Sequence, residues 1–222
     1  MTWAGFAAVF AAFFLTHSIP VRPVIKNRLI AHLGARGFTM AYSVLSLAML
    51  TLLIWAAGQA PYVQLWAQMP WHRHVVHLGM LAVCLILALS LGRPNPFSFG
   101  GGRNDTFDPA RPGIVRWVRH PILLALALWA GLHLLPNGDL AHVILFGVLG
   151  VFAVAGRHLI DRRKQRDLGP ERWQELWQAT RRAALLRTTT PPAMIVFRLA
   201  CGILLFVALV VAHPHVIGVP AL

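Results

Sequence analysis

The chain has 222 residues, of which 57% are hydrophobic and 12% are charged, and its mean hydropathy is +0.63. An average soluble domain carries about a quarter charged residues, so this composition excludes a water-soluble fold and predicts a protein solvated mostly by lipid. The formal net charge of +13 would suggest a nucleic-acid partner in a soluble protein. Here the lysines and arginines lie between apolar segments, where anionic lipid headgroups explain them, and we expect no nucleic acid.

Six apolar runs are long enough, or nearly so, to cross the hydrocarbon core of a membrane, which requires about 20 helical residues. In chain order the runs cover residues 3–19, 38–57, 75–91, 121–135, 140–159 and 195–212. Six helices with short connections use almost the whole length. We therefore predict an all-α, polytopic membrane helix bundle with about six transmembrane helices, forming one domain over residues 1–222.

The positive charges of the connections predict how these helices are oriented. The first, third and fifth connections carry nearly all of the lysines and arginines, whereas the second carries only Arg73 and the fourth, residues 136–139, carries none. Because basic loops are retained in the cytoplasm, the odd connections are expected inside. Both termini are then expected outside, in the periplasm.

Two cytoplasmic connections are too long to be simple turns. Residues 92–120 are rich in proline and glycine, with three consecutive glycines at 100–102, and we expect either a plain structured loop or one that faces a cofactor. In the fifth connection Pro170 suits the first turn of a helix, and Trp173 and Trp177 recur at helical spacing. This pattern predicts a helix on the inner leaflet, anchored by its tryptophans, or a helical extension of the fifth span.

Four histidines lie near the ends of apolar runs, where polar side chains are costly. His17 lies near the inner end of the first run, His77 and His133 near the outer ends of the third and fourth, and His142 near the start of the fifth. Neutral imidazole is a natural ligand for haem iron in a helix bundle, although a single helix-end histidine is more often hydrogen-bonded to backbone or water. By depth alone, His77 and His133 form the better ligand pair, while His17 and His120 would form an inner cluster.

The order of several short motifs along nearly the whole chain resembles the NnrU family of bacterial membrane proteins. These motifs are Thr16-His17-Ser18, His77, Gly92-Arg93-Pro94-Asn95-Pro96, Arg119-His120-Pro121, Leu132-His133 and Asn137-Gly138. The resemblance implies a multi-pass inner-membrane protein of nitrite and nitric oxide metabolism in denitrification, related to the plastid zeta-carotene isomerase, a membrane haem b enzyme. It also implies that His17 and His133 correspond to the isomerase's candidate haem ligands, and that Ala130 replaces its alternative cysteine ligand.

The resemblance therefore predicts a bound haem b, with His17 and His133 as ligands and His77 as the substitute. Arg93, Arg119 and His120 are the further cofactor-binding candidates, since the arginines would pair with haem propionates if the haem lies toward the inner face. The expected partners are the lipid bilayer, haem and a small hydrophobic substrate. The expected chemistry is redox sensing, electron transfer or haem-assisted isomerisation, and the sequence indicates neither the substrate nor the oligomeric state.

Two other functions stay open. The triplet Arg119-His120-Pro121, followed by Asn137 and a basic helix with tryptophans, also resembles the isoprenylcysteine carboxyl methyltransferase superfamily, which binds S-adenosylmethionine near the cytoplasmic face. The paired glutamates of that superfamily are replaced here around Asp161-Arg162-Arg163. The third possibility is a membrane assembly or regulatory factor without catalytic activity.

Overall fold

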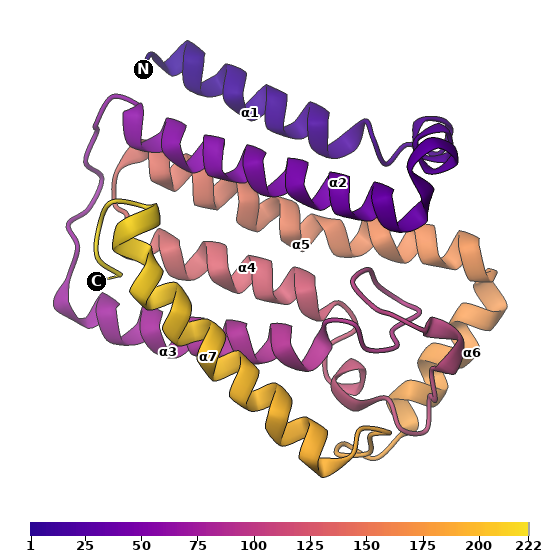
Figure 1. Ribbon diagram of the computed structural model, residues 1–222. Coiled ribbons are helices and arrows are strands. Elements are labelled where there is room, and N and C mark those ends of the chain that lie inside the picture. Colours follow the sequence, from indigo (N-terminus) through magenta and orange to yellow (C-terminus); the bar gives the residue numbers. More distant parts are fainter. Residues whose placement is uncertain (222) are drawn as a thin grey trace. The chain divides into compact units, whose positions relative to one another are not determined.

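The computed structural model describes residues 1–221 and consists of helices joined by loops (Figure 1). Leu222, the last residue of the expected domain, lies outside the described residues. The elements in chain order are α1 (Trp3–Ser18), α2 (Pro23–Gln59), α3 (Pro70–Ser90), the short 3-10 helices η1 (Asn104–Thr106) and η2 (Gly113–Arg116), α4 (Pro121–Leu134), α5 (Leu140–Leu168), α6 (Pro170–Arg182) and α7 (Pro192–Val216). Each of the six predicted apolar runs lies within one of these helices or ends within a residue of it, which confirms the all-α helical bundle.

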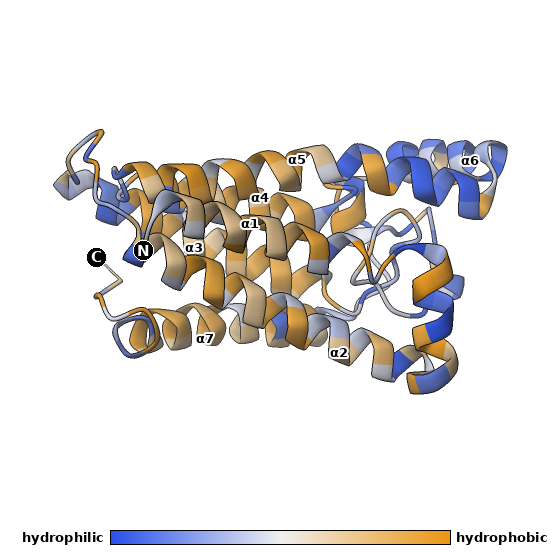
Figure 2. Ribbon diagram, turned by 90° about the horizontal axis from the view of Figure 1, so that it is seen from above, coloured by the Kyte–Doolittle hydropathy of each residue, from blue (hydrophilic) through white to orange (hydrophobic). Residues whose placement is uncertain are grey.

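Four helices, namely α2, α3, α5 and α7, are long and apolar enough to cross a membrane. The helices α1 and α4 are also apolar but have only 16 and 14 residues. At ~1.5 Å per residue they span about 24 and 21 Å, against a hydrocarbon core of about 30 Å. Figure 2 shows hydrophobic residues along the spanning helices, with hydrophilic residues gathered on α6 and the adjoining end of α5. This distribution fits an integral membrane protein with a polar portion outside the hydrocarbon.

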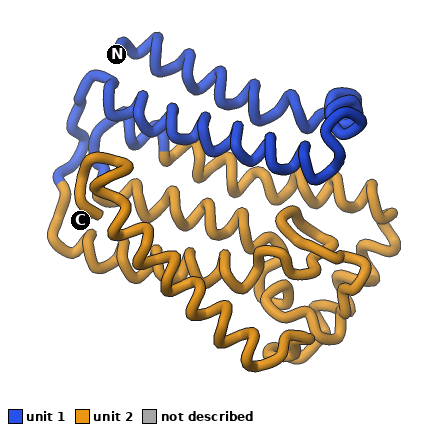
Figure 3. The backbone as a smooth tube through the Cα atoms, viewed as in Figure 1, with its two compact units in different colours: residues 1–67, 137–145 blue, residues 68–136, 146–222 orange. Residues whose placement is uncertain are grey.

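The described chain divides into two compact units, coloured separately in Figure 3. Unit 1 comprises residues 1–67 and 137–145, in which α1 packs against α2. The Met1 amine donates a hydrogen bond to the Gln59 carbonyl at 2.6 Å, so the start of α1 lies beside the end of α2. Gly34, with φ 71°, interrupts α2 in a conformation that glycine adopts without strain. The apolar run 38–57 therefore forms the part of α2 that follows this break.

Unit 2 comprises residues 68–136 and 146–222, and in it α3 packs against both α4 and α7. Small residues let these helices approach closely. A Cβ added at Gly202 of α7 would lie 3.0 Å from the Leu85 side chain and 3.2 Å from the Cys84 carbonyl on α3. Gly79 of α3 lies against Leu132 of α4 in the same way. The α3–α4 and α3–α7 contacts thus depend on glycine at the points of closest approach.

A small hydrophobic core, like that of a water-soluble domain, lies outside the apolar helices of unit 2. Phe97, Val115 and Trp173 are 0, 2 and 5% exposed, and Phe107 and Trp177 pack around them. The Phe97 ring lies 5.9 Å from the Trp173 ring and 5.4 Å from the Trp177 ring between centroids. The predicted helix of the fifth connection is confirmed as α6, but Trp173 is buried in this core. Burial of the indole against Phe97 and Val115 removes more apolar surface from water than an interfacial position would.

Candidate functional site

A polar cluster at the start of α4 gathers side chains from three elements of unit 2. His120 immediately precedes α4 and is 3% exposed. Its Nε2 lies 2.9 Å from Asp161 Oδ1 on α5, and its Nδ1 lies 3.1 Å from the Ser98 hydroxyl in the preceding loop. Arg119 donates through Nη2 to the second carboxylate oxygen of Asp161. One carboxylate therefore binds both members of the Arg119-His120 pair and connects α4 with α5.

Local sequence explains why the cluster forms at this position. Pro121 occupies the first turn of α4 and fixes where the helix begins. Asn95 holds the loop beside it, because its Nδ2 donates to the Arg119 carbonyl at 3.0 Å and its Oδ1 accepts from the Phe97 amide at 3.1 Å. The same Asn95 thus fixes the backbone before His120 and directs Phe97 into the small core.

Arg119 also joins the cluster to α6. Its guanidinium carbon lies 4.5 Å from the Trp177 ring centroid and 5.1 Å from the Trp173 ring centroid. A guanidinium over an indole face is a favourable cation–π contact. Arg119 is therefore held by one carboxylate and two aromatic rings, all within unit 2.

The electrostatics of the cluster favour a neutral His120. Burial lowers the pKa of His120, and although the Asp161 carboxylate opposes this shift, the positive charges of Arg119 and Arg157 add to it. A neutral ring that donates from Nε2 to Asp161 accepts at Nδ1 from the Ser98 hydroxyl. Arg119 Nε also lies 3.3 Å from His120 Nε2, but the shorter contact to Asp161 is the better candidate for the Nε2 proton. Both ring nitrogens therefore have partners within the cluster.

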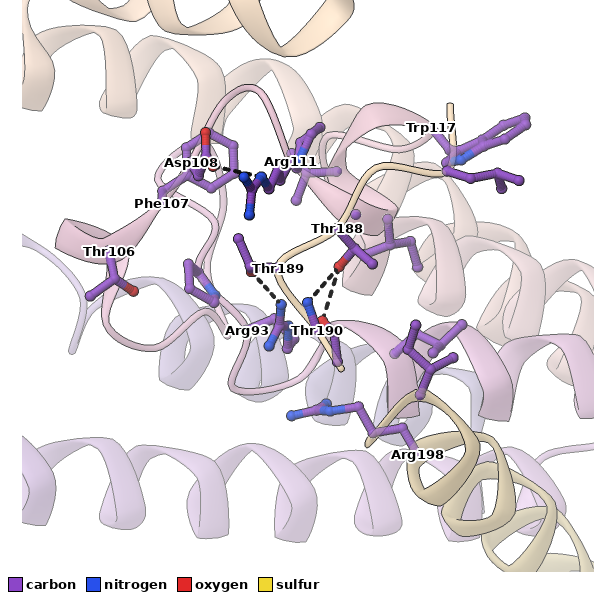
Figure 4. A pocket seen from close by; sticks show the side chains of 18 of the residues that line it. Arg93, Thr106, Phe107, Asp108, Arg111, Trp117, Thr188, Thr189, Thr190 and Arg198 are labelled. Atoms are coloured by element: carbon purple, nitrogen blue, oxygen red, sulfur yellow. Dashed lines mark hydrogen bonds and ion pairs between the residues drawn. The ribbon is translucent and has the colours of Figure 1, made fainter. Parts of the chain in front are cut away.

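The structure places the third predicted cofactor-binding residue, Arg93, elsewhere. Arg93 donates through Nη2 to the Thr189 hydroxyl at 3.2 Å and lines a cavity of about 270 Å³ (Figure 4). Arg119 does not line this cavity. The two arginines that sequence reasoning assigned to one cofactor thus face different surroundings in unit 2.

The predicted metal ligands His77 and His133 lie on neighbouring helices of unit 2. His77 Nδ1 lies 2.8 Å from the Arg73 carbonyl, and its ring meets the Phe206 ring of α7 edge-on at 6.2 Å. His133 Nδ1 lies 2.8 Å from the Trp129 carbonyl. Within residues 1–221, no group of three or more His, Cys, Asp or Glu side chains is arranged to hold a metal ion.

His17, the remaining predicted ligand, belongs to unit 1 and is described there by itself. Its ring stacks on Phe13 at 5.5 Å and lies 5.6 Å from the Tyr42 ring of α2. The Tyr42 hydroxyl donates to the His17 carbonyl at 2.8 Å. Aromatic contacts and this hydrogen bond fix the C-terminal end of α1 against α2.

Sequence reasoning gave Ser98, Asp161 and Arg198 no role at these sites, and it named Asp161 only where the paired glutamates of the methyltransferase superfamily are replaced. Ser98 and Asp161 are 22 and 41 positions from His120 in the sequence, and no local sequence pattern predicts that they contact it. Arg198 had a visible signal, because it is a single arginine inside the last apolar run. Its Nη1 donates to the Ala88 and Leu91 carbonyls at 2.7 and 3.0 Å and so caps the end of α3.

The apolar helices and the polar cluster at their end define the class of this molecule as a multi-pass helical membrane protein. A family model described as NnrU protein matches residues 5–221. The chain therefore belongs to the NnrU family, as the order of its motifs predicted. No curated protein and no solved structure matches it.

Proposed function

We propose that this protein binds haem b in the bacterial inner membrane and acts in nitrite and nitric oxide metabolism, with His133 as one axial ligand. The haem and the metabolic role come from what the NnrU resemblance implies. The structural observation that supports haem binding is the setting of the His133 ring.

His133 has the features of a prepared imidazole ligand. A proton on Nδ1, donated to the Trp129 carbonyl at 2.8 Å, leaves the lone pair on Nε2. Histidines that bind metals in proteins usually donate their second ring N–H in this way, which fixes the tautomer and the ring orientation. The Trp129 and Phe146 rings lie 5.1 and 5.2 Å from the His133 ring and provide the apolar surroundings that a porphyrin requires. Bound haem would supply an iron centre for electron transfer or for isomerisation of a small hydrophobic substrate.

The second ligand is either His77 or His17. His77 shares the backbone-bonded Nδ1 arrangement and lies on α3, which packs against α4 where Gly79 meets Leu132. His17 is the partner that the family resemblance implies. Substitution of each residue separates these two arrangements.

Arg119 is far from a haem on His133. Positions 119 and 133 lie at opposite ends of α4, about 20 Å apart at ~1.5 Å per residue. This is farther than a propionate extends from its own iron. A haem ligated by His133 would therefore lie at the far end of α4 from Arg119, and its propionates would need other partners.

A visible spectrum of the detergent-purified protein, expressed with excess haem precursor, tests the proposal. We expect a Soret band in the wild type that His133→Ala abolishes and that either His77→Ala or His17→Ala strongly weakens. His142→Ala is the matched control, because it removes an imidazole from the first turn of α5 that is bonded to the Asp139 carboxylate. The absence of a Soret band in the wild type, or its survival in His133→Ala, would overturn haem binding at this residue.

The metabolic role requires a separate experiment. A deletion strain grown without oxygen should consume nitrite or nitric oxide more slowly than its parent. We expect the wild-type protein to restore the rate and His133→Ala to fail at equal membrane abundance. Equal rates in the parent and the deletion strain would contradict the role in denitrification.

His120 belongs to the triplet Arg119-His120-Pro121, on which the resemblance to the isoprenylcysteine carboxyl methyltransferase superfamily is based. Because both His120 ring nitrogens have partners inside the cluster, we expect no S-adenosylmethionine binding by calorimetry at millimolar concentration. Binding that His120→Gln abolishes would favour methyl transfer over the haem proposal.

A further inference from the structure

The cavity of unit 2 that Arg93 lines is rich in positive charge. Its wall includes three arginines, Arg93, Arg111 and Arg198, and a single carboxylate, that of Asp108. Asp108 lies 3.8 Å from the Arg111 guanidinium, and both side chains are largely exposed. Three guanidinium groups with one carboxylate leave an excess of two positive charges. In Figure 4 the Arg93 and Arg198 side chains lie on the same side of the cavity.

Arg93 and Arg198 lack carboxylate partners among the described residues. The hydrogen bonds given for them go to the Thr189 hydroxyl and to the Ala88 and Leu91 carbonyls. The Arg198 Nε is buried, and no acceptor within residues 1–221 reaches it. Burial, followed by the like charges of Arg198 and Arg103, lowers the pKa of Arg93. Positive groups held together without a counter-charge are stabilised by a bound anion.

The threonine side of the cavity is rigidly held. The Gly113 amide donates to the Arg187 carbonyl at 3.0 Å, and the Trp117 indole donates to the Leu185 carbonyl at 2.9 Å. The Thr188 hydroxyl accepts from the Thr190 amide and donates to the Thr190 hydroxyl, both at 3.0 Å. Two segments far apart in sequence are thereby fixed to each other. The hydroxyl groups beside the arginines are thus in place before any ligand arrives.

The rest of the wall is apolar and opens beside exposed hydrophobic side chains. Leu89 at the end of α3 and Ile195 at the start of α7 contribute to it. Leu186 and Trp117, at its edge, are 87 and 61% exposed. Helix ends of this kind lie at headgroup depth in a membrane. The position suits a ligand with an anionic head and an apolar tail.

We propose that this cavity binds the phosphate headgroup of an anionic phospholipid, with Arg93 and Arg198 on the phosphate and the acyl chains along Leu186 and Trp117. Phosphate oxygens accept charge-assisted hydrogen bonds from guanidinium groups, and threonine hydroxyls complete such sites. This site is separate from the haem proposal, which rests on His133.

Lipid retention by the full-length protein tests the site. Native mass spectrometry from mixed micelles should show phosphatidylglycerol retained in preference to phosphatidylcholine. Arg93→Gln should weaken this retention about tenfold, the effect of losing one charge-assisted hydrogen bond. Arg181→Gln is the matched control, since it removes the same charge from an exposed position on α6 that does not line the cavity.

Four results would overturn the proposal. The first is equal retention of phosphatidylglycerol and phosphatidylcholine by the wild type. The second is an equal loss of phosphatidylglycerol in Arg93→Gln and Arg181→Gln, which would reflect general charge. The third is thermal stabilisation by inorganic phosphate with none by phosphatidylglycerol, which would assign the site to the free ion. A Soret band that survives in Arg93→Gln supports a site apart from the haem, whereas its loss would assign Arg93 to the haem instead.

Discussion

Asp161 is the residue on which the polar cluster at the start of α4 depends. Its carboxylate is the acceptor for both Arg119 and His120, which are adjacent in the sequence and bind different oxygens of the carboxylate. The pair Arg119-His120 could be singled out from the sequence, because a basic pair before a proline-initiated helix is unusual in an apolar chain. Its partners could not, since a contact across 41 residues is decided by the packing of α4 against α5.

Asp161→Asn should destabilise unit 2. The substitution leaves the Arg119 charge half-buried against two indoles without its carboxylate. Removing one partner of a buried ion pair lowers the free energy of unfolding by roughly 3–5 kcal/mol. Because the Arg119 and Asp161 side chains are partly exposed, we expect a loss of about 2 kcal/mol. Thermal unfolding in detergent, followed by tryptophan fluorescence, measures the change. Asp167→Asn is the control because Asp167 pairs only at the surface, 3.9 Å from Arg163, and an equal loss in both variants would contradict a special role for Asp161.

The protein should lose stability as the pH falls below about 6.5. The pKa of His120 is lowered in the folded state, chiefly by burial. The unfolded chain, in which a histidine titrates near ~6.5, therefore takes up a proton that the folded chain does not. The contribution of His120 is complete above that pH and declines through the lowered pKa. In His120→Gln the decline of the unfolding temperature between pH 7 and pH 5 should be shallower than in the wild type, and identical slopes would contradict a neutral buried His120.

At the scale of elements, the positions of the helices could be predicted from the sequence. The surface against which each helix packs its apolar face could not. Apolar runs predicted α3, α4 and α7 from sequence alone, and Pro170 predicted where α6 begins. The spacing of Trp173 and Trp177 predicted α6, but it gave no indication that Phe97 supplies a buried surface for them. An amphipathic helix buries its apolar side in lipid or in protein with similar gain. Whether α6 packs against lipid or against protein is therefore decided by its contact with Phe97, which the spacing of its tryptophans does not reveal.

Phe97→Ala should release α6 from the loop. The Phe97 side chain is fully buried between Phe107 and the two indoles, and truncating such a ring costs roughly 3–5 kcal/mol. Hydrogen exchange over residues 170–182 should become faster while exchange in α3 stays slow. Phe99→Ala is the matched control because that ring is 43% exposed. Unchanged protection of α6 in Phe97→Ala would contradict docking through this core.

The α3–α7 contact gives a second prediction at this scale. Gly202→Val should destabilise the protein by about 1–3 kcal/mol, because its side chain overlaps Leu85 and the Cys84 carbonyl. Gly147→Val is the control, since nothing lies within 4 Å of a Cβ at that position of α5. Thermal unfolding in detergent compares the two. Equal unfolding temperatures would indicate that α3 and α7 separate enough to admit a side chain.

At the scale of the whole molecule, the number of membrane crossings depends on α1 and α4. Within residues 1–221, length alone gives four spanning helices and omits these two, whereas the apolar runs predict six. Contacts within unit 2 favour a crossing by α4. His120, before its first turn, contacts Asp161, and His133 in its last turn contacts Phe146. The helix α4 therefore runs antiparallel to α5 over residues 146–161, about 22 Å at ~1.5 Å per residue. It traverses the same depth as this part of α5.

Cysteine labelling tests whether α4 crosses the membrane. Tyr62 lies before α3 and Arg181 lies after α5, so α3, α4 and α5 are the helices between them. Three crossings place these positions on opposite sides of the membrane, and two crossings place them on the same side. In a Cys84→Ala, Cys201→Ala background, we expect an impermeant maleimide to label Tyr62→Cys in intact spheroplasts and Arg181→Cys only in inverted vesicles. Because neither α1 nor α7 lies between the two positions, labelling of both from one side would show that α4 turns back within the membrane, whatever the other helices do.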